Sequence, residues 1–241
     1  MRLIDGQRLV VLSGAGLSKA SGIPTFRDAD GLWEQHRLEE VATPQAWRRD
    51  PDLVRRFYDE RRMNALSALP NPAHEALVRL QHALGRRRVT LITQNVDGLL
   101  EKAGAIEVLA MHGSLWGVRC ERDEAHPHLQ IAGVQSPGAR CSVCGAPLRP
   151  DIVWFGEQPQ AVDRVTEALE RCDVFLSVGT SGLVYPAAGF ALAARARGAV
   201  TIEVNPEPSG GAFDEVIAKP AEEALPCLVA DWLGEASALC P

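Results

Sequence analysis

The chain has 241 residues, of which 46% are hydrophobic and 23% charged, and its formal net charge is −6. A chain of this length can bury a sizeable core and still carry a small additional module. Its negative charge argues against nucleic-acid binding, which needs a basic face to neutralise phosphates.

No stretch approaches the ~20 apolar residues of a membrane span. The apolar run at residues 9–12 is too short for a signal peptide. We therefore expect a cytoplasmic protein with neither nucleic-acid nor membrane partners. In a reducing compartment its six cysteines are expected to be thiols or metal ligands and not disulfides.

Short apolar runs alternate with segments of helical length, which is typical of a parallel sheet covered by helices. The predicted strands are Leu9–Ser13, Val89–Thr93, Val108–Met111, Val174–Val178 and Val200–Val204. The predicted helices are Asp52–Leu66, Pro72–Leu84, Gln160–Arg171 and Pro186–Arg197. Each strand ends in small or polar residues, and ligands of open α/β sheets bind beyond these ends. We expect a Rossmann-like α/β fold, with helices on both faces of the sheet and one shared crevice.

A glycine turn, Gly14-Ala15-Gly16, follows the first predicted strand and leads into a predicted helix. Glycines there let the backbone approach a pyrophosphate, and a helix N-terminus supplies N–H donors. Lys19 stands where the usual G-x-G-x-x-G pattern has its last glycine, so the turn alone fits an ordinary strand-to-helix connection equally well.

The residues that follow make a more specific pattern. Gly14–Asp28 resembles the signature of the sirtuin family, and further motifs occur in the family's order at Gln94–Asp97, His112-Gly113, Phe155–Glu157 and Gly179–Ser181. The resemblance extends from Val10 to about Ala221. It implies an NAD-dependent protein-lysine deacylase, which converts an acylated lysine and NAD to free lysine, nicotinamide and 2′-O-acyl-ADP-ribose.

The resemblance also implies roles for individual residues. The reaction needs a base near neutral pH to take a proton from a ribose hydroxyl, and His112 is the candidate. Asn95 would orient the ribose, and Asp97 would bind the carboxamide of nicotinamide. Asn and Asp in this motif could also cap a helix, alone or together with these roles. The implied cofactor contacts are Gly14, Ala15, Gly16, Thr25, Phe26, Arg27, Gln94, Asn95, Asp97, Gly179, Thr180, Ser181, Asn205, Glu207 and Ala221.

Two of these contacts carry particular expectations. Phe26 would shield the reacting ribose from water, which strengthens electrostatic interactions in the site. Ala221 is assigned to the adenine, but the family usually has glycine where Lys219 or Pro220 falls. The segment Val153–Glu157 resembles the strand that pairs with the substrate backbone. Val153, Phe155, Gly156 and Glu157 are therefore predicted to bind substrate.

Residues 119–151 differ in character, with clustered cysteines, prolines and glycines. Cys141 and Cys144 form half of a zinc ribbon, and Cys120 supplies a third thiol. Asp123 stands where a second cysteine of the first pair would be, so the fourth ligand is Asp123 or a nearby histidine, His126 or His128. A module that has lost its metal and is held by packing is the alternative.

These patterns divide the chain into three units. Residues 1–24, 71–117 and 152–241 form the Rossmann-like NAD-binding domain, and residues 118–151 form the small zinc-ribbon-like module. Residues 25–70 hold the cofactor loop and a helical segment for the acyl pocket.

In that helical segment, Tyr58 and Arg61 are three residues apart and can share a helix face. They resemble the Tyr-x-x-Arg of desuccinylase-type members, in which a guanidinium fork grips an acidic acyl group. Ala42 resembles the small residue that leaves room for a longer acyl chain. Six of the fifteen residues from Arg48 to Arg62 are arginines, so an arginine at this offset could also reflect composition. The prediction is a preference for succinyl and malonyl groups, with acetyl also accepted.

Two other functions fit the same motifs. One is an NAD glycohydrolase or ADP-ribosyltransferase, which would release nicotinamide without an acylated peptide. The other is a non-catalytic NAD-binding regulator, against which the presence of both His112 and Asn95 argues.

Overall fold

The computed structural model describes residues 6–24, 36–211 and 213–235. Its centre is a six-stranded sheet in the order β3-β2-β1-β7-β8-β9, in which every neighbouring pair is parallel. The strands are β1 (Leu9–Ser13), β2 (Val89–Thr93), β3 (Val108–Ala110), β7 (Val174–Val178), β8 (Val200–Val204) and β9 (Glu215–Ile217). The predicted strands are confirmed, except that β3 ends one residue earlier, and β9 was not predicted.

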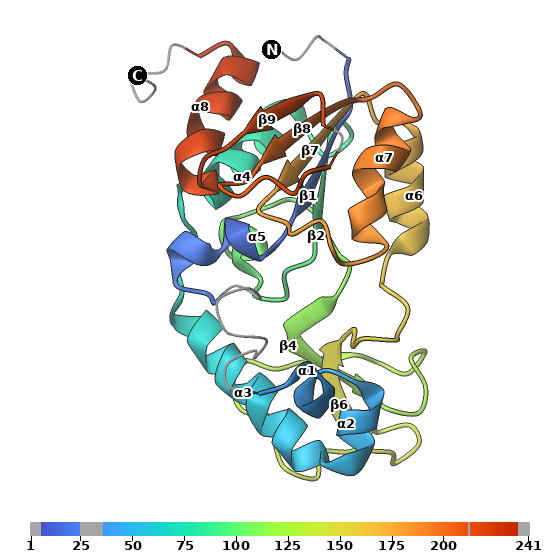
Figure 1. Cartoon of the computed structure of the whole chain (residues 1–241). Coiled ribbons are helices and arrows are strands. Elements are labelled where there is room, and N and C mark those ends of the chain that lie inside the picture. Colours follow the sequence, from blue (N-terminus) through green and yellow to red (C-terminus); the bar gives the residue numbers. More distant parts are fainter. Residues whose placement is uncertain (1–5, 25–35, 212, 236–241) are drawn as a thin grey trace.

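Helices cover both faces of this sheet (Figure 1). On one face lie α4 (Pro72–Leu84) and α8 (Ala221–Leu233), and on the other α6 (Val162–Glu170) and α7 (Phe190–Arg195). Because side chains alternate along a strand, Leu9 and Val11 of β1 join the first core, whereas Val10 and Leu12 join the second. This burial on both faces explains why the strands are continuous apolar runs.

Local sequence decides where the helices begin and end. Before α4, the side chain of Asn71 accepts hydrogen bonds from the first-turn N–H groups of Ala73 and His74, so this helix has its predicted bounds. Helix α6 starts two residues later than predicted, because Ala161 has a left-handed conformation with φ of 56°. The predicted helix Pro186–Arg197 is divided into a 3-10 turn, η3 (Ala187–Gly189), and α7. Helix α8 was not predicted, and Pro226 inside it resembles a helix breaker.

A second, three-stranded sheet lies at the other end of the molecule, in the order β5-β4-β6. Its strands, β4 (Gly113–Cys120), β5 (Leu129–Gln130) and β6 (Leu148–Ile152), are antiparallel. Beside it lie α1 (Leu38–Val41), α2 (Pro44–Arg49) and α3 (Pro51–Ser67), where the sequence predicted a helix at Asp52–Leu66. Strand β4 starts directly after His112 and ends at Cys120, so Met111 and His112 form the link between the large sheet and the small one.

Buried charges join α3 to this second sheet. Arg62 is fully buried and donates to the backbone oxygen of Leu115, to Asp59 at 2.6 Å and to the backbone oxygen of Gly133 at 3.1 Å. Asp59 also accepts a hydrogen bond of 2.9 Å from the backbone N–H of Gln135. A buried cation needs such acceptors, so these contacts fix α3 against the loop that precedes β6.

The cysteines in the described part of the chain fall into two groups. Cys120, Cys141, Cys144 and Cys172 are free thiols, whereas Cys227 is disulfide-bonded. The expectation that no cysteine forms a disulfide is therefore wrong for Cys227. Among the described residues, no helix is long and apolar enough to cross a bilayer.

Candidate active site

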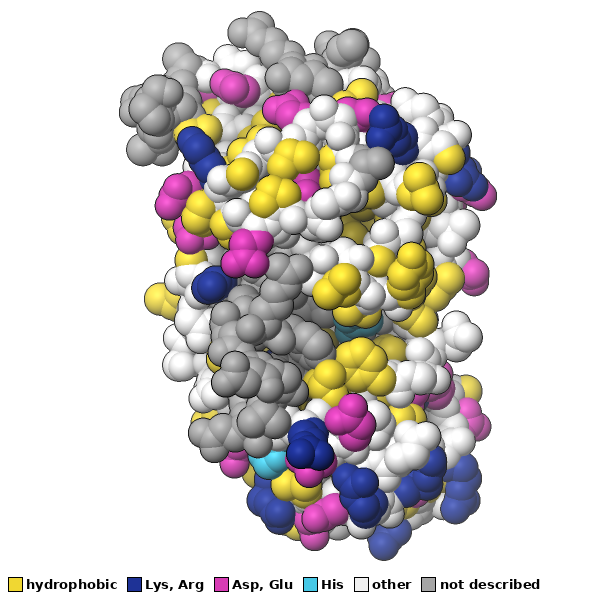
Figure 2. All heavy atoms as spheres, in the orientation of Figure 1, with side chains coloured by type: hydrophobic (Ala, Val, Ile, Leu, Met, Phe, Trp, Pro, Cys, Tyr) yellow, Lys and Arg dark blue, Asp and Glu magenta, His cyan; other side chains and the backbone are white. Residues whose placement is uncertain are grey.

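A cleft of about 1090 Å³ lies beyond the carboxyl ends of the parallel strands, between the two sheets. Figure 2 shows the molecule hollowed across the middle of one face, with hydrophobic side chains beside the hollow. Every predicted cofactor, catalytic and substrate residue in the described part of the chain lines this cleft. These residues are Gly14, Ala15, Gly16, Ala42, Tyr58, Arg61, Gln94, Asn95, Asp97, His112, Val153, Phe155, Gly156, Glu157, Gly179, Thr180, Ser181, Asn205, Glu207 and Ala221. Thr25, Phe26 and Arg27 lie outside the described residues.

The glycine turn after β1 packs backbone to backbone against the loop after β7. Gly16 N donates to Gly179 O at 2.9 Å, and a Cβ added to Gly16 would lie 2.6 Å from the Gly179 Cα. The helix predicted to follow is instead two 3-10 turns, η1 (Ala15–Leu17) and η2 (Lys19–Ser21). Gly22, with a left-handed φ of 82°, ends the second turn. These glycines are thus required by the close approach of two loops at the centre of the sheet.

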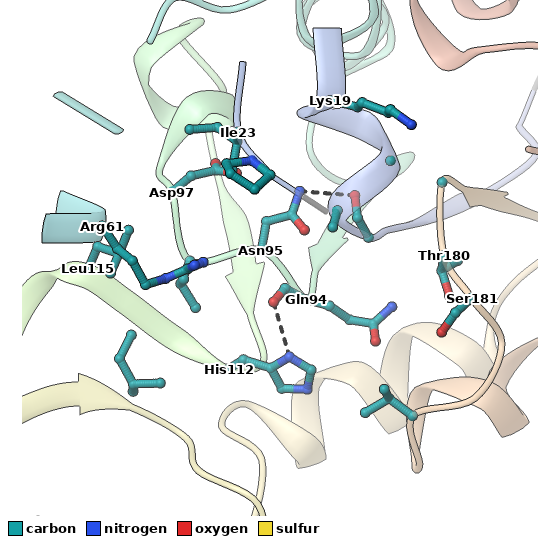
Figure 3. A pocket seen from close by; sticks show the side chains of 18 of the residues that line it. Lys19, Ile23, Arg61, Gln94, Asn95, Asp97, His112, Leu115, Thr180 and Ser181 are labelled. Carbon is teal, nitrogen blue, oxygen red and sulfur yellow. Dashed lines mark hydrogen bonds between the residues drawn. The ribbon is translucent and has the colours of Figure 1, made fainter. Parts of the chain in front are cut away.

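The imidazole of His112 lies between β3 and β4 and is partly buried. Its Nδ1 lies 3.0 Å from the backbone oxygen of Gln94, which can only accept, so Nδ1 carries the proton of the neutral ring (Figure 3). Burial lowers the pKa of His112, and the bond to Gln94 offsets part of that shift. The ring is therefore neutral at pH 7, with an Nε2 lone pair available as a base.

Asn95 is held by groups from β1 and its following turn. Its Nδ2 donates to Gly14 O at 3.0 Å and to Ser18 Oγ at 3.2 Å, and Ser18 Oγ donates to Asp97 at 2.7 Å. Asp97 also accepts from the N–H of Leu99, the first residue of α5 (Leu99–Lys102), whose N-cap residue is Gly98. Burial raises the pKa of Asp97. Ser18 connects Asn95 and Asp97, and it was not among the predicted site residues.

Strand β8 ends at Val204, and Asn205, the residue after it, supports the loop after β7. Asn205 Nδ2 donates to Thr180 O at 3.0 Å, and the hydroxyls of Thr180 and Ser181 accept from the N–H groups two residues ahead. In Figure 3 the side chain of Gln94 points across the pocket toward Thr180 and Ser181. Ala221 is buried at the first position of α8, with Pro220 beside it in the cleft lining.

Helix α3 carries Tyr58 and Arg61 to the other end of the cleft. Tyr58 is fully buried, and its hydroxyl accepts a hydrogen bond of 3.1 Å from Trp154 Nε1. Arg61 points into the pocket in Figure 3, and its guanidinium carbon lies 5.5 Å from the ring centroid of Phe57. Ala42 is buried beside them, and its backbone oxygen accepts from Phe155 N at 3.0 Å. Tyr58, Arg61 and Ala42 therefore line one end of the cleft.

Val153–Glu157 is not a strand in the structure, and its pairing with a substrate backbone stays a prediction. Strand β6 ends at Ile152, the N–H of Val153 donates to His112 O, and Gly156 has φ of 90° in a turn. The carboxylate of Glu157 accepts from Arg149 at 2.6 and 2.9 Å and from Trp154 N at 2.8 Å. Glu157 thus stabilises the turn through contacts within the protein.

At the far end of β4, four ligand atoms come together from Cys120, His126, Cys141 and Cys144, all within 4.8 Å of one another. A tetrahedral zinc with Zn–S bonds of about 2.3 Å needs ligands at such separations. His126 Nδ1 lies 3.4 Å from Cys141 Sγ, and its Nε2 lies 3.6 Å from Asp123. His128 pairs with Asp151 instead. The donor set fits zinc, and of the three candidates for the fourth ligand it is His126 that lies with the three thiols.

The sequence model of the Sir2 family matches residues 14–186, which is most of the chain and includes His112, Asn95 and both glycine loops. The chain belongs to the Sir2 family.

The chain resembles named Sir2-family relatives over most of its length. It is 50% identical over 229 residues to an NAD-dependent protein deacylase of Shigella flexneri, covering 92% of this chain and 83% of that protein. It is 49% identical to an NAD-dependent protein deacylase of Caulobacter vibrioides, covering 92% of this chain and 95% of that protein. A solved Sir2 homologue in complex with NAD superposes with a TM-score of 0.85 at 40% identity, covering 93% of this chain and 89% of that one. A mutant Sir2 homologue in complex with ADP-ribose superposes with a TM-score of 0.87 at 39% sequence identity, covering 95% of this chain and 92% of that one. The predicted family, fold and enzyme class are confirmed.

Proposed function

We propose that this Sir2-family enzyme removes acyl groups from protein lysines with NAD, and that it favours succinyl and malonyl groups over acetyl. The observation that carries the proposal is the position of Tyr58 and Arg61, which line the same cleft as His112. The names of the relatives, NAD-dependent protein deacylase, support the reaction class.

NAD is the co-substrate, and its ribose accepts the acyl group. The two loops that meet at Gly16 and Gly179 leave backbone close to where a pyrophosphate would lie. Asn95, which donates to Ser18, would orient the ribose. His112 Nε2 would take the proton from the ribose hydroxyl that attacks the acyl group. Roles for Thr25, Phe26 and Arg27 stay predictions.

The acyl preference follows from the cost of burying a carboxylate. A charged group that enters a closed pocket loses its hydration and must be paired. Arg61 offers a planar guanidinium that matches a carboxylate, and Tyr58 adds a hydroxyl donor. Burial raises the pKa of Tyr58 above its ordinary value, so this hydroxyl keeps its proton at neutral pH. Ala42 leaves space for the longer chain.

We further propose that the cluster of Cys120, His126, Cys141 and Cys144 holds a structural zinc, which would stabilise the module at residues 118–151. We also propose a division of the chain into three units. They are this module, the acyl-pocket segment at residues 25–70, and the NAD-binding domain formed by the remaining residues. A cytoplasmic location stays a prediction.

A panel of peptides with one sequence and acetyl-, succinyl- or malonyl-lysine, assayed with and without NAD, tests the proposal. Deacylated peptide, nicotinamide and acyl-ADP-ribose are quantified by mass spectrometry. We expect equal amounts of the three products, formed only with NAD, and higher kcat/KM for the acidic groups. Nicotinamide released at the same rate without peptide would indicate a glycohydrolase, and equal kcat/KM on all peptides would contradict the acyl preference.

A further inference from the structure

Trp154 lines the cleft but is not one of the residues predicted individually to bind substrate. It follows β6, only 2% of the residue is exposed, and its indole packs between Trp47 and Tyr58, with ring centroids 5.9 and 6.5 Å away. Its Nε1 donates the 3.1 Å hydrogen bond to the hydroxyl of Tyr58. Trp154 therefore contacts the polar atom that the proposed function places at the acyl carboxylate.

This hydrogen bond constrains where the Tyr58 proton points. A phenolic hydroxyl has one proton, which lies near the ring plane in one of two orientations, and an oxygen that accepts. Because the indole N–H donates to this oxygen, the proton must point away from Trp154. Within the described residues, the structure shows no acceptor for that proton, although Tyr58 is fully buried. A buried donor is costly when unsatisfied, so an acceptor on a bound acyl group would be favoured.

A second set of contacts fixes Trp154 itself. The guanidinium carbon of Arg149 lies 3.4 Å from the ring centroid of Trp154, and Arg149 is paired with both carboxylate oxygens of Glu157. The backbone N–H of Trp154 donates to the same carboxylate. A cation over an indole face is attracted by the ring, and it withdraws electron density, which strengthens the N–H as a donor.

We propose that Trp154 is a positioning residue that determines acyl specificity: its indole N–H orients the Tyr58 hydroxyl so that the proton faces the carboxylate of a succinyl or malonyl group. This inference rests on the proposed acyl preference. Its effect is selective, because an acetyl group offers no carboxylate to receive the proton.

The test is a double-mutant cycle of Trp154→Phe and Tyr58→Phe, with KM and kcat measured on succinyl- and acetyl-lysine peptides of one sequence. Trp47→Phe is the matched control, since Trp47 belongs to the same aromatic cluster but donates its Nε1 to Glu121 at 2.8 Å outside the cleft lining. We expect Trp154→Phe to raise the KM for succinyl-lysine by about 2- to 10-fold, the range of one neutral hydrogen bond. Deacetylation should change less.

In the Tyr58→Phe background, Trp154→Phe should cause almost no further loss of succinyl-to-acetyl selectivity, because the hydroxyl it orients is gone. Trp47→Phe should leave that selectivity ratio as it is in either background. If Trp154→Phe does not fold, β-(3-benzothienyl)alanine at position 154 replaces the N–H by sulfur in a ring of the same shape, and the same results are expected.

Equal losses on both peptides, or effects of Trp154→Phe and Tyr58→Phe that add fully, would overturn the role of Trp154. A selective Tyr58→Phe together with a non-selective Trp154→Phe would overturn only this inference. If Tyr58→Phe itself leaves the succinyl-to-acetyl selectivity unchanged, Tyr58 does not bind the acyl carboxylate. The proposed role of Trp154 is then overturned as well.

Discussion

Nδ1 of His112 donates a hydrogen bond of 3.0 Å to the backbone oxygen of Gln94, the residue that follows β2. This contact fixes the tautomer as well as the ring position, because it leaves the lone pair on Nε2. The backbone just after β2 thus holds His112 in the tautomer that can accept a proton. Residues on other elements line the rest of the cleft.

Replacing His112 should therefore separate catalysis from binding. His112→Ala should lower deacylation by ~10²–10⁴-fold, the usual effect of losing a general base. NAD should still bind, because the loops around Gly16 and Gly179 are unchanged. Single-turnover deacylation and calorimetric titration with NAD measure the two effects. Near-normal turnover of the acyl-peptide by the variant would refute the assignment of the base.

The pH dependence follows from the neutral state of His112. Burial lowers its pKa from the ordinary value of 6.5, and only the unprotonated ring can accept a proton. The activity should therefore be retained below pH 6.5 and fall as the pH drops through the lowered pKa. The acid limb of kcat/KM against pH measures this value. An acid limb at or above pH 6.5 would show that burial does not set the pKa of the essential base.

Arg61→Met should remove the acid preference. A hydrogen bond to a charged group contributes roughly 1.5–3 kcal/mol, equivalent to roughly 10–150-fold in binding. The KM for succinyl- and malonyl-lysine should rise by about this factor, while deacetylation changes much less. The matched control is Arg56→Met, which removes an exposed arginine of the same helix. Equal losses on acidic and acetyl substrates would make Arg61 a structural residue.

The metal cluster distinguishes two histidines. Zinc content measured by plasma mass spectrometry should be near one per chain in the unaltered protein and strongly reduced in His126→Ala, which removes a ligand. His128→Ala should keep its zinc, because His128 bonds to Asp151. Asp123→Asn should bind zinc more weakly, by about 10- to 100-fold, as expected for a group that orients a ligating histidine. Full zinc content in His126→Ala would exclude it as the fourth ligand.

His74 should make the fold sensitive to mild acid. Its Nδ1 accepts from the backbone N–H of Asn71 at 3.2 Å, and burial lowers its pKa from 6.5 to about 4. The folded state thus prefers the neutral ring, so its contribution is complete above pH 6.5 and is lost as the pH falls toward 4. At roughly 1.4 kcal/mol per pKa unit, this loss is about 3 kcal/mol. Urea midpoints between pH 7 and 4.5 should fall less steeply in His74→Gln, and equal slopes would contradict the prediction.

Much of the site could be predicted because its chemistry is local in sequence. The polar residues that follow β1, β2, β3 and β7 stand next to apolar runs, and parallel strands bring these ends to one edge. The residues that were missed act through distant partners. Ser18 matters because Asn95 and Asp97 lie beside it, and nothing in the glycine motif indicates this contact.

The errors of prediction have physical causes as well. Val153–Glu157 has the apolar start of a strand, but the carboxylate of Glu157 closes a turn onto Trp154 through contacts that begin at Arg149 on β6. Helix α8 contains Pro226, which local propensity counts against a helix, yet burial of Leu225 and Trp232 against the sheet outweighs that cost. The fourth zinc ligand was left open because the spacing alone does not rank Asp123, His126 and His128.

The burial of Arg62 has a consequence for anyone who would exchange acyl pockets between relatives. A chimaera that receives α3 alone would also receive a cation that depends on the backbone oxygens of Leu115 and Gly133, which belong to other segments. In a recipient without those acceptors the guanidinium would be stranded in an apolar interior, and the helix would be displaced together with Tyr58 and Arg61. The unit to transfer is therefore α3 together with the loop that holds Gly133 and Gln135. These two segments are far apart in the sequence, so a transfer of acyl preference would require both.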